Sequence, residues 1–313
     1  METFAIPFLL FVGTLLTLQA AANVQLSTAL GSPFGASTLQ LAIGAVLLLA
    51  LTVVVGTLGA FDRIPHVTAW HLVGGVGSAV YITAGILLFP RLGAVVAVGL
   101  IIAGQMAASL LLDGLGWLGV EERALGVAAA LGALAVLAGV WLIVRAQSAG
   151  GPASTAASEP LHRRAGWILL GLAAGAVLPV QGAINAQLRA DVDAPITVAA
   201  FSFLVATLAM ASVLLLMLAA RRTPVPSAAG LERVPWWGWL GGACGATYVT
   251  AVFTLIPHIG VAATVALTVA GQQATSVVVD RRGLLRLPQR PVGPRRLAGV
   301  ALLLAGVVLI QLA

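Results

Sequence analysis

The sequence predicts an all-α integral membrane protein with ten transmembrane helices, arranged as two inverted five-helix repeats. Three observations predict this fold class: the composition, a series of long apolar segments, and a match between the two halves of the chain. Of the 313 residues, 60% are hydrophobic and only 8% are charged, whereas about 25% of the residues in a soluble domain are charged. Most of the chain is therefore expected to lie in lipid.

Ten apolar segments have the length of roughly 17 to 25 residues that a membrane-spanning helix requires. The first resembles a secretory signal, because Ala20 to Ala22 look like a cleavage site, but its leader carries Glu2 and no basic residue, so we expect a retained helix. The predicted spans are residues 4–25, 37–58, 69–89, 94–112, 124–144, 165–186, 195–219, 236–256, 260–279 and 297–312.

The segment between the fifth and sixth spans, Ser148 to His162, is rich in Ser, Ala, Gly and Pro, which is the composition of a flexible linker. The chain therefore divides into a first five-span repeat at 1–147, a linker at 148–162 and a second five-span repeat at 163–313.

The two halves match at polar, aromatic and proline positions, which shared apolar filler does not explain. A shift of 162 residues places Gln19, Asn23, Gln25, Leu26 and Pro33 on Gln181, Asn185, Gln187, Leu188 and Pro195. After a five-residue insertion, a shift of 167 places Trp70, Gly74, Gly75, Tyr81 and Pro90 on Trp237, Gly241, Gly242, Tyr248 and Pro257. The same shift places Gly104, Gln105, Ser109, Asp113 and Gly116 on Gly271, Gln272, Ser276, Asp280 and Gly283.

Each repeat contains five predicted spans. Because five is odd, the second repeat must cross the bilayer in the opposite sense to the first. Inverted repeats of this kind are the usual architecture of secondary transporters, because exchanging the conformations of the two halves turns a central site from one side to the other. The sequence therefore favours a transporter. A flippase for a lipid-linked small molecule and a structural or regulatory membrane subunit are the alternatives.

The arginines predict the orientation of the chain in the membrane. All 16 basic residues are Arg, and all but Arg63, Arg123 and Arg189 fall in the connections on one side of the predicted spans. Because positively charged loops stay in the cytoplasm, we expect the linker and the segment 281–296 to be cytoplasmic and both termini to lie outside. Nucleic-acid binding is not expected from this basic excess.

At the residue level the sequence resembles the YdcZ-like family of the drug/metabolite transporter superfamily. The resemblance rests on QAAAN at 19–23 and QGAIN at 181–185, on WGWLGGACGATY at 237–248, on PHIG at 257–260, and on AGQ at 270–272 followed by Asp280. It covers nearly the whole chain. The resemblance implies a ten-span inverted-repeat fold in the bacterial inner membrane that exports small molecules.

Amide side chains inside the spans are the leading candidates for a substrate pathway, because a buried amide is costly unless it faces a partner or a wet cavity. Gln19 and Asn23 are four residues apart and share one helix face, and Gln181 and Asn185 repeat the arrangement. Hydrogen bonding between neighbouring helices is the alternative role. The same reasoning, at matching positions of spans four and nine, adds Gln105 and Gln272.

Two further pairs occupy equivalent positions in the repeats. Tyr81 and Tyr248 lie in spans three and eight, where a tyrosine offers a hydroxyl and a ring face either to a substrate or to another helix. Asp113 and Asp280 lie at the ends of spans four and nine and are candidates for proton coupling; solvation at the helix end or pairing with an Arg is the alternative.

No charged residue falls near the centre of a predicted span, so the expected cargo is a small neutral or amphipathic metabolite or drug, carried by uniport or by proton antiport. The expected partners are this substrate and membrane lipid. Neither an enzyme signature nor a metal-ligand spacing is present, and the chain has no lysine, so we expect no catalysis, no metal and no cofactor.

Overall fold

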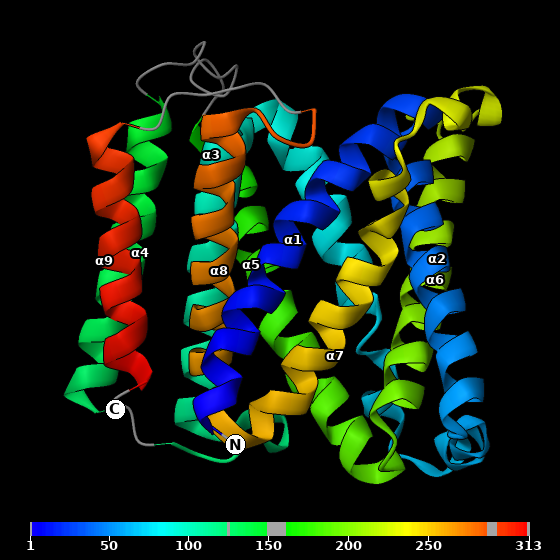
Figure 1. Ribbon diagram of the computed structural model, residues 1–313, viewed down its shortest axis with the longest axis horizontal. Coiled ribbons are helices and arrows are strands. Elements are labelled where there is room, and N and C mark those ends of the chain that lie inside the picture. Colours follow the sequence, from blue (N-terminus) through cyan, green and yellow to red (C-terminus); the bar gives the residue numbers. More distant parts are fainter. Residues whose placement is uncertain (1, 124–125, 149–160, 287–292, 312–313) are drawn as a thin grey trace. The chain divides into compact units, whose positions relative to one another are not determined.

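The computed structural model describes residues 2–123, 126–148, 161–286 and 293–311 (Figure 1), and no strand occurs among them. The all-α prediction is therefore confirmed for these residues. Most of the predicted linker, at 149–160, lies outside them. The α-helices are α1 (Glu2–Leu30), α2 (Pro33–Val55), α3 (Val76–Leu115), α4 (Val127–Ser148), α5 (Leu161–Val192), α6 (Pro195–Ala219), α7 (Gly241–Ile259), α8 (Val261–Arg282) and α9 (Pro294–Gln311).

Five short 3₁₀ helices lie in the described connections between these helices. They are η1 (Leu58–His66), η2 (Ala69–Val73), η3 (Trp117–Gly119), η5 (Ala228–Arg233) and η6 (Trp236–Leu240).

Eight helical segments are long and apolar enough to cross a membrane, and α3 contributes to two of them, Ala69–Leu88 and Ala97–Leu115. Two shorter apolar helices lie within α4 and α9, at Val127–Gly139 and Leu297–Ile310. Each of the ten predicted spans overlaps one of these segments. Spans three and four were expected as separate helices, but the structure assigns the residues between them to α3 as well.

Local sequence explains where several helices begin and end. Ser32 caps α2 by accepting a hydrogen bond from the backbone N–H of Gly35 at 3.2 Å, and Pro33 supplies a first helical residue with no N–H to satisfy. Pro195 begins α6 in the same way. Gly260 separates α7 from α8 with φ of 85°, a conformation that favours glycine.

The described chain forms two compact units, each built from segments of both halves of the sequence. Unit 1 comprises Met1–Thr14, Ala84–Val180 and Pro257–Ala313, and unit 2 comprises Leu15–Thr83 and Gln181–Ile256. The repeats are therefore not the compact units of the structure. That the chain consists of two five-span repeats stays a prediction.

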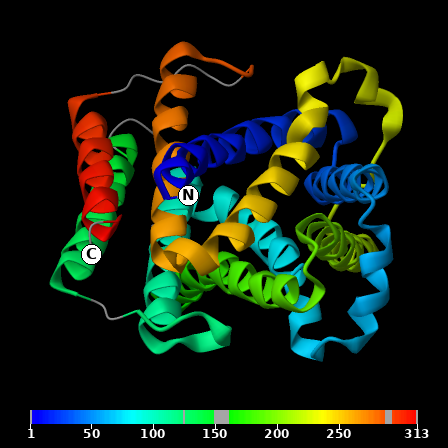
Figure 2. The ribbon, with the colours of Figure 1, turned by 60° about the horizontal axis from the view of Figure 1, so that its bottom comes forward.

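Each unit pairs equivalent helices from the two halves. In unit 2, α2 packs against α6, and in unit 1, α4 packs against α9. Figures 1 and 2 both show each pair side by side, and in Figure 1 the members of each pair run in opposite directions. A pair of equivalent helices that packs antiparallel is the arrangement expected of inverted repeats.

Glycine contacts in unit 1 follow the repeat register. An added Cβ at Gly104 would meet the carbonyl oxygen of Leu172, and one at Gly271 would meet that of Leu10. A shift of 167 converts Gly104 to Gly271, and a shift of 162 converts Leu10 to Leu172. The same contact is thus made twice, with the roles of the two halves exchanged. Small residues permit such close helix contacts in membranes.

A second matched pair of contacts occurs in unit 2. Gly75 lies against the carbonyl oxygen of Ser202, and Gly242 lies against that of Gln40. Shifts of 167 and 162 again convert one contact into the other. The repeat found in the sequence therefore extends to helix packing.

Candidate functional site

The predicted site residues are distributed over both units. Unit 2 holds Gln19, Asn23, Tyr81, Gln181, Asn185 and Tyr248, and unit 1 holds Gln105, Asp113, Gln272 and Asp280. Each group is described within its own unit.

The amides of the second half are held by serine hydroxyls. The hydroxyl of Ser78 on α3 donates a 3.0 Å hydrogen bond to Oε1 of Gln181 on α5. One turn further along α5, Nδ2 of Asn185 donates to the hydroxyl of Ser202 on α6 at 3.0 Å. Only 4% of Gln181 and 1% of Asn185 is exposed. These bonds tie α5 to its neighbours, as interhelical polar contacts do in membranes.

Oδ1 of Asn185 is buried and has no hydrogen-bond partner. It lies against Gly74, where any side chain would overlap it. The missing Cβ therefore lets the amide pack directly on the backbone that begins the third predicted span.

The amides of the first half are less fully paired. Asn23 on α1 is half-buried, and its Nδ2 donates to the hydroxyl of Ser37 on α2 across 3.4 Å, a long distance for this bond. Its Oδ1 is buried without a partner. Gln19, one turn earlier, is also half-buried. An added Cβ at Gly245 of α7 would lie 2.6 Å from its Nε2.

Gln40 on α2 joins this group, and the sequence reasoning missed it. It is 4% exposed, its Nε2 is buried without a partner, and its amide lies against Gly241 of α7. One signal was available: a shift of 162 places Gln40 on Ser202, so this position is polar in both halves.

The two tyrosines differ in environment within unit 2. Tyr248 on α7 is buried, whereas Tyr81 on α3 is half-buried. Their role in a substrate pathway stays a prediction.

Glutamine, serine and threonine side chains recur along α3 and α8 of unit 1, and several of their hydroxyls bond oxygens of their own helix. Gln105 is buried and Gln272 is half-buried. The hydroxyl of Ser109 bonds the backbone oxygen of Met106 at 2.9 Å, and those of Thr264 and Thr268 also bond oxygens of their own helical segment, at 2.7 and 3.1 Å. Serine and threonine hydroxyls often bond the backbone of their own helix in this way, so the two glutamines remain the pathway candidates there.

Asp113 caps the start of α8. Its carboxylate accepts hydrogen bonds from the backbone N–H groups of Val261 and Ala262, at 2.8 and 2.6 Å. Two otherwise unpaired donors of the helix terminus are thereby satisfied, and the negative charge lies at the positive end of the helix dipole.

Arg123 completes the arrangement around this cap. Its backbone N–H donates to the carbonyl oxygen of Asp113 at 2.8 Å, and its guanidinium donates to that of His258 at 3.2 Å. The equivalent Asp280 belongs to α8, but its side chain is outside the described part of the structure. Proton coupling through either aspartate stays a prediction.

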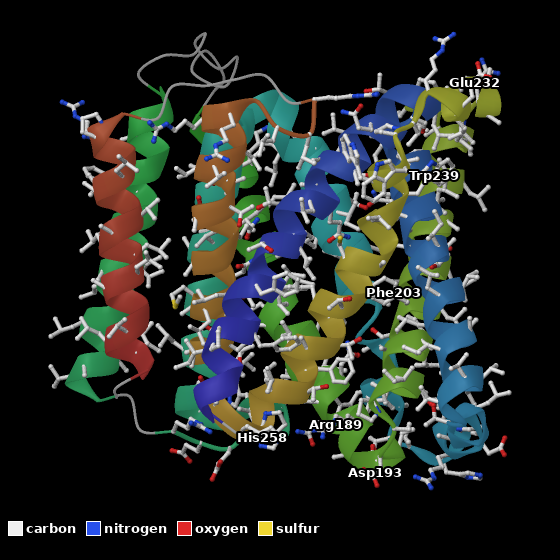
Figure 3. All side chains as sticks on the ribbon, viewed as in Figure 1. Arg189, Asp193, Phe203, Glu232, Trp239 and His258 are labelled. Atoms are coloured by element: carbon white, nitrogen blue, oxygen red, sulfur yellow. The ribbon has the colours of Figure 1, made fainter. Side chains whose placement is uncertain are left out.

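Charged residues of unit 2 gather at its two ends. Figure 3 shows Arg189 and Asp193 at one end of this unit and Glu232 at the other, with Phe203 between them. At the first end, Nδ1 of His71 contacts Oδ2 of Asp191. Charges at the ends and an apolar middle are typical of a membrane-spanning bundle.

Comparison with known proteins identifies the family. The family described as "Putative inner membrane exporter, YdcZ", in the drug/metabolite transporter group, matches residues 4–142 and 166–309. The chain belongs to this family. The two matched segments are the two halves of the chain, so two fused copies of the YdcZ unit are present, as the sequence predicted.

Membership in the YdcZ family agrees with an inner-membrane location and with a transporter rather than an enzyme. No curated protein matches the chain. One crystal structure, described only as that of a protein, covers 99% of this chain and 97% of its own, with a TM-score of 0.71 and 19% sequence identity. This likeness concerns the fold alone.

The chemistry available in unit 2 is neutral hydrogen bonding. Every residue of this unit is described, and its buried side chains that can form hydrogen bonds are Ser, Thr, Gln, Asn, Tyr248 and His71. In the described ranges of the whole chain, no three His, Cys, Asp or Glu side chains are grouped as a metal site would require. The arrangement is therefore suited to holding a neutral polar molecule.

Proposed function

We propose that the protein is a secondary transporter that exports a small neutral or amphipathic molecule by alternating access. One observation carries the proposal: carboxamides with buried, unpaired atoms, at Asn23, Gln40 and Asn185, lie in apolar helices of a unit whose buried side chains include no Asp, Glu or Arg. Polar groups within membrane helices mark substrate pathways. The inner-membrane exporter family supports the same function.

The mechanism that we propose uses two inverted repeats of five spans. The antiparallel pairs α2·α6 and α4·α9 support this arrangement (Figure 1), and so do the exchanged glycine contacts at Gly104 and Gly271. Rocking one half of the chain against the other would then open the pathway to each side in turn. Gln105, Gln272, Tyr81 and Tyr248 are the further residues that we assign to the pathway.

We also propose that both termini lie outside and that the linker is cytoplasmic. Within unit 1, Figure 1 places the start of α1 and the end of α9 at one end and the end of α8 at the other. Arg281 and Arg282 lie in the last turn of α8, which favours a cytoplasmic position for that end under the positive-inside rule.

Untargeted profiling of metabolites, in cells with and without the gene, would supply the substrate. Flux of that substrate into proteoliposomes, with and without a pH gradient, then tests transport and its coupling. We expect flux with the native chain and its loss in Asn23→Leu, because leucine removes both hydrogen-bonding atoms at similar size. An Asn23→Leu variant that inserts normally and keeps full flux would contradict the assignment.

A further inference from the structure

The amide groups of the two halves have different partners, although their positions are equivalent. In the second half, Ser78 and Ser202 supply hydroxyls to Gln181 and Asn185. A shift of 167 places Ser78 on Gly245, and a shift of 162 places Gln40 on Ser202. The first half therefore has a glycine in place of one serine and a third carboxamide in place of the other.

Oδ1 of Asn23 has no donor, and Oδ1 of the equivalent Asn185 has none either. The difference between the halves lies at Gln40, whose Nε2 has no acceptor. The first half of unit 2 thus has an unused carboxamide acceptor, at Asn23, and an unused carboxamide donor, at Gln40. Both atoms are buried. Buried polar groups in native structures are nearly always paired, so each exception requires an explanation.

Two of the three side chains lie against glycines of α7. The amide of Gln40, from α2, lies against Gly241, and the amide of Gln19, from α1, lies against Gly245. Gly241 and Gly245 are one turn apart and share a face of the helix. Asn23 is one turn from Gln19 on α1 and bonds Ser37, which is one turn from Gln40 on α2, so these three carboxamides gather in one region of unit 2. We name Gln19, Asn23 and Gln40 the carboxamide site.

We infer that the carboxamide site binds the substrate and that the substrate carries a neutral carboxamide-type group, with an N–H donor beside a carbonyl acceptor. The ligand N–H would donate to Oδ1 of Asn23, and the ligand carbonyl would accept from Nε2 of Gln40. Gln181 and Asn185 tie α5 to Ser78 on α3 and to Ser202 on α6, and we assign them to helix packing instead. This inference rests on the proposed transport function, because it names the class of molecule that the exporter carries.

The electrostatics of unit 2 favour a neutral group over a charged one. The fully described unit buries no Asp, Glu or Arg. A carboxylate or ammonium group in this region would lose its hydration without gaining a counter-ion, which is strongly unfavourable.

Benzamide is a suitable probe, with benzoate and benzylamine as charged analogues of similar shape. Thermal unfolding of the full chain in detergent reports binding, because a ligand of the folded state raises the melting temperature. We expect benzamide at up to about 20 mM to raise it and the two charged analogues to leave it unchanged. No effect of benzamide, or an equal effect of benzoate, would overturn the inference.

Reciprocal substitutions between the halves provide matched variants. Gly245→Ser gives Gln19 the hydroxyl that Ser78 gives Gln181, and the atoms nearest to the added Cβ belong to the flexible end of Gln19. Gln40→Ser places on α2 the residue found at the equivalent position 202. We expect each to weaken benzamide binding at least about tenfold and to leave the melting temperature without ligand nearly unchanged.

The control is the reverse change in the second half. Ser78→Gly should lower the melting temperature without ligand and keep the affinity for benzamide. Binding that is lost in Ser78→Gly and kept in Gly245→Ser would overturn the assignment of the site. If the native chain binds benzamide but shows no flux, the proposed transport function fails and the carboxamide site stands. If Gly245→Ser keeps native flux, the assignment of the carboxamide site fails and the transport function stands.

Discussion

The hydroxyl of Ser78 donates a 3.0 Å hydrogen bond to Oε1 of Gln181, and both side chains are buried. Replacing Ser78 with Ala leaves the carbonyl of Gln181 buried without its donor. We expect a loss of about 1 to 3 kcal/mol in the free energy of unfolding, measured by thermal unfolding in detergent. Thr247→Ala is the control, because this exposed hydroxyl bonds only its own helix, at Ala243. An equal loss in both variants would contradict a special role for Ser78.

The carboxylate of Asp113 is predicted to stabilise the start of α8. Asp113→Ala removes both hydrogen bonds to the helix terminus and should cost about 2 kcal/mol of stability, whereas Asp113→Asn keeps one acceptor oxygen and should cost about 1 kcal/mol. Thermal unfolding of the two variants measures this order. A cost of zero for both would contradict the role as a cap.

Flux measurements on Asp113→Asn separate this cap from proton coupling. If Asp113 acts only as a cap, the variant retains the native dependence of flux on a pH gradient. If the proton passes through Asp113, the dependence disappears while substrate binding remains.

The contact between His71 and Asp191 is predicted to hold η2 on the end of α5. Asp191→Asn keeps the shape of the side chain but removes its charge, so we expect a loss of about 1 kcal/mol in the free energy of unfolding, measured by thermal unfolding in detergent. Unchanged stability in Asp191→Asn would contradict a stabilising role for the charge of Asp191.

Glycines that lie against a backbone carbonyl of another helix should tolerate no Cβ. Gly104→Ala and Gly271→Ala each place a carbon against a fixed backbone carbonyl, at Leu172 and Leu10, and we expect each to lose about 1 to 3 kcal/mol. Gly85→Ala is the matched control, because an added Cβ there meets nothing within 4 Å, and it should gain up to about 1 kcal/mol from helix propensity. Thermal unfolding of the three variants in the same detergent measures these differences in stability, and equal stability of all three would contradict the prediction.

The repeat register was readable from the sequence because glutamine, asparagine and proline are rare enough in this composition to align without ambiguity. The same register predicts which glycine contacts recur. Hydrophobicity also located the apolar segments, because their lengths are set by the bilayer. It gave no reason to expect that residues 89–96 would continue α3, because hydropathy locates the apolar segments and does not report the backbone conformation between them.

The role of Asp113 was beyond sequence reasoning, because its hydrogen bonds reach Val261 and Ala262, far along the chain. His71 and Asp191 are separated in the same way and were not connected. Gln40 was missed for a different reason. A single amide in an apolar segment does not disturb the hydrophobic pattern. Its position points to a polar contact only once the equivalent residue, Ser202, is seen to bond Asn185.

The central claim is that the two halves cross the membrane in opposite senses around a neutral polar pathway, and labelling of two equivalent turns tests it most directly. Gly31 and Asp193 are exposed, are equivalent under the shift of 162, and both have left-handed backbone, with φ of 67° and 49°. Single cysteines at these positions, with Cys244→Ser, are treated with a membrane-impermeant maleimide in intact cells and in inverted vesicles. We predict that Asp193→Cys reacts only from outside and Gly31→Cys only from the cytoplasmic side; reaction of both from one side would contradict the account.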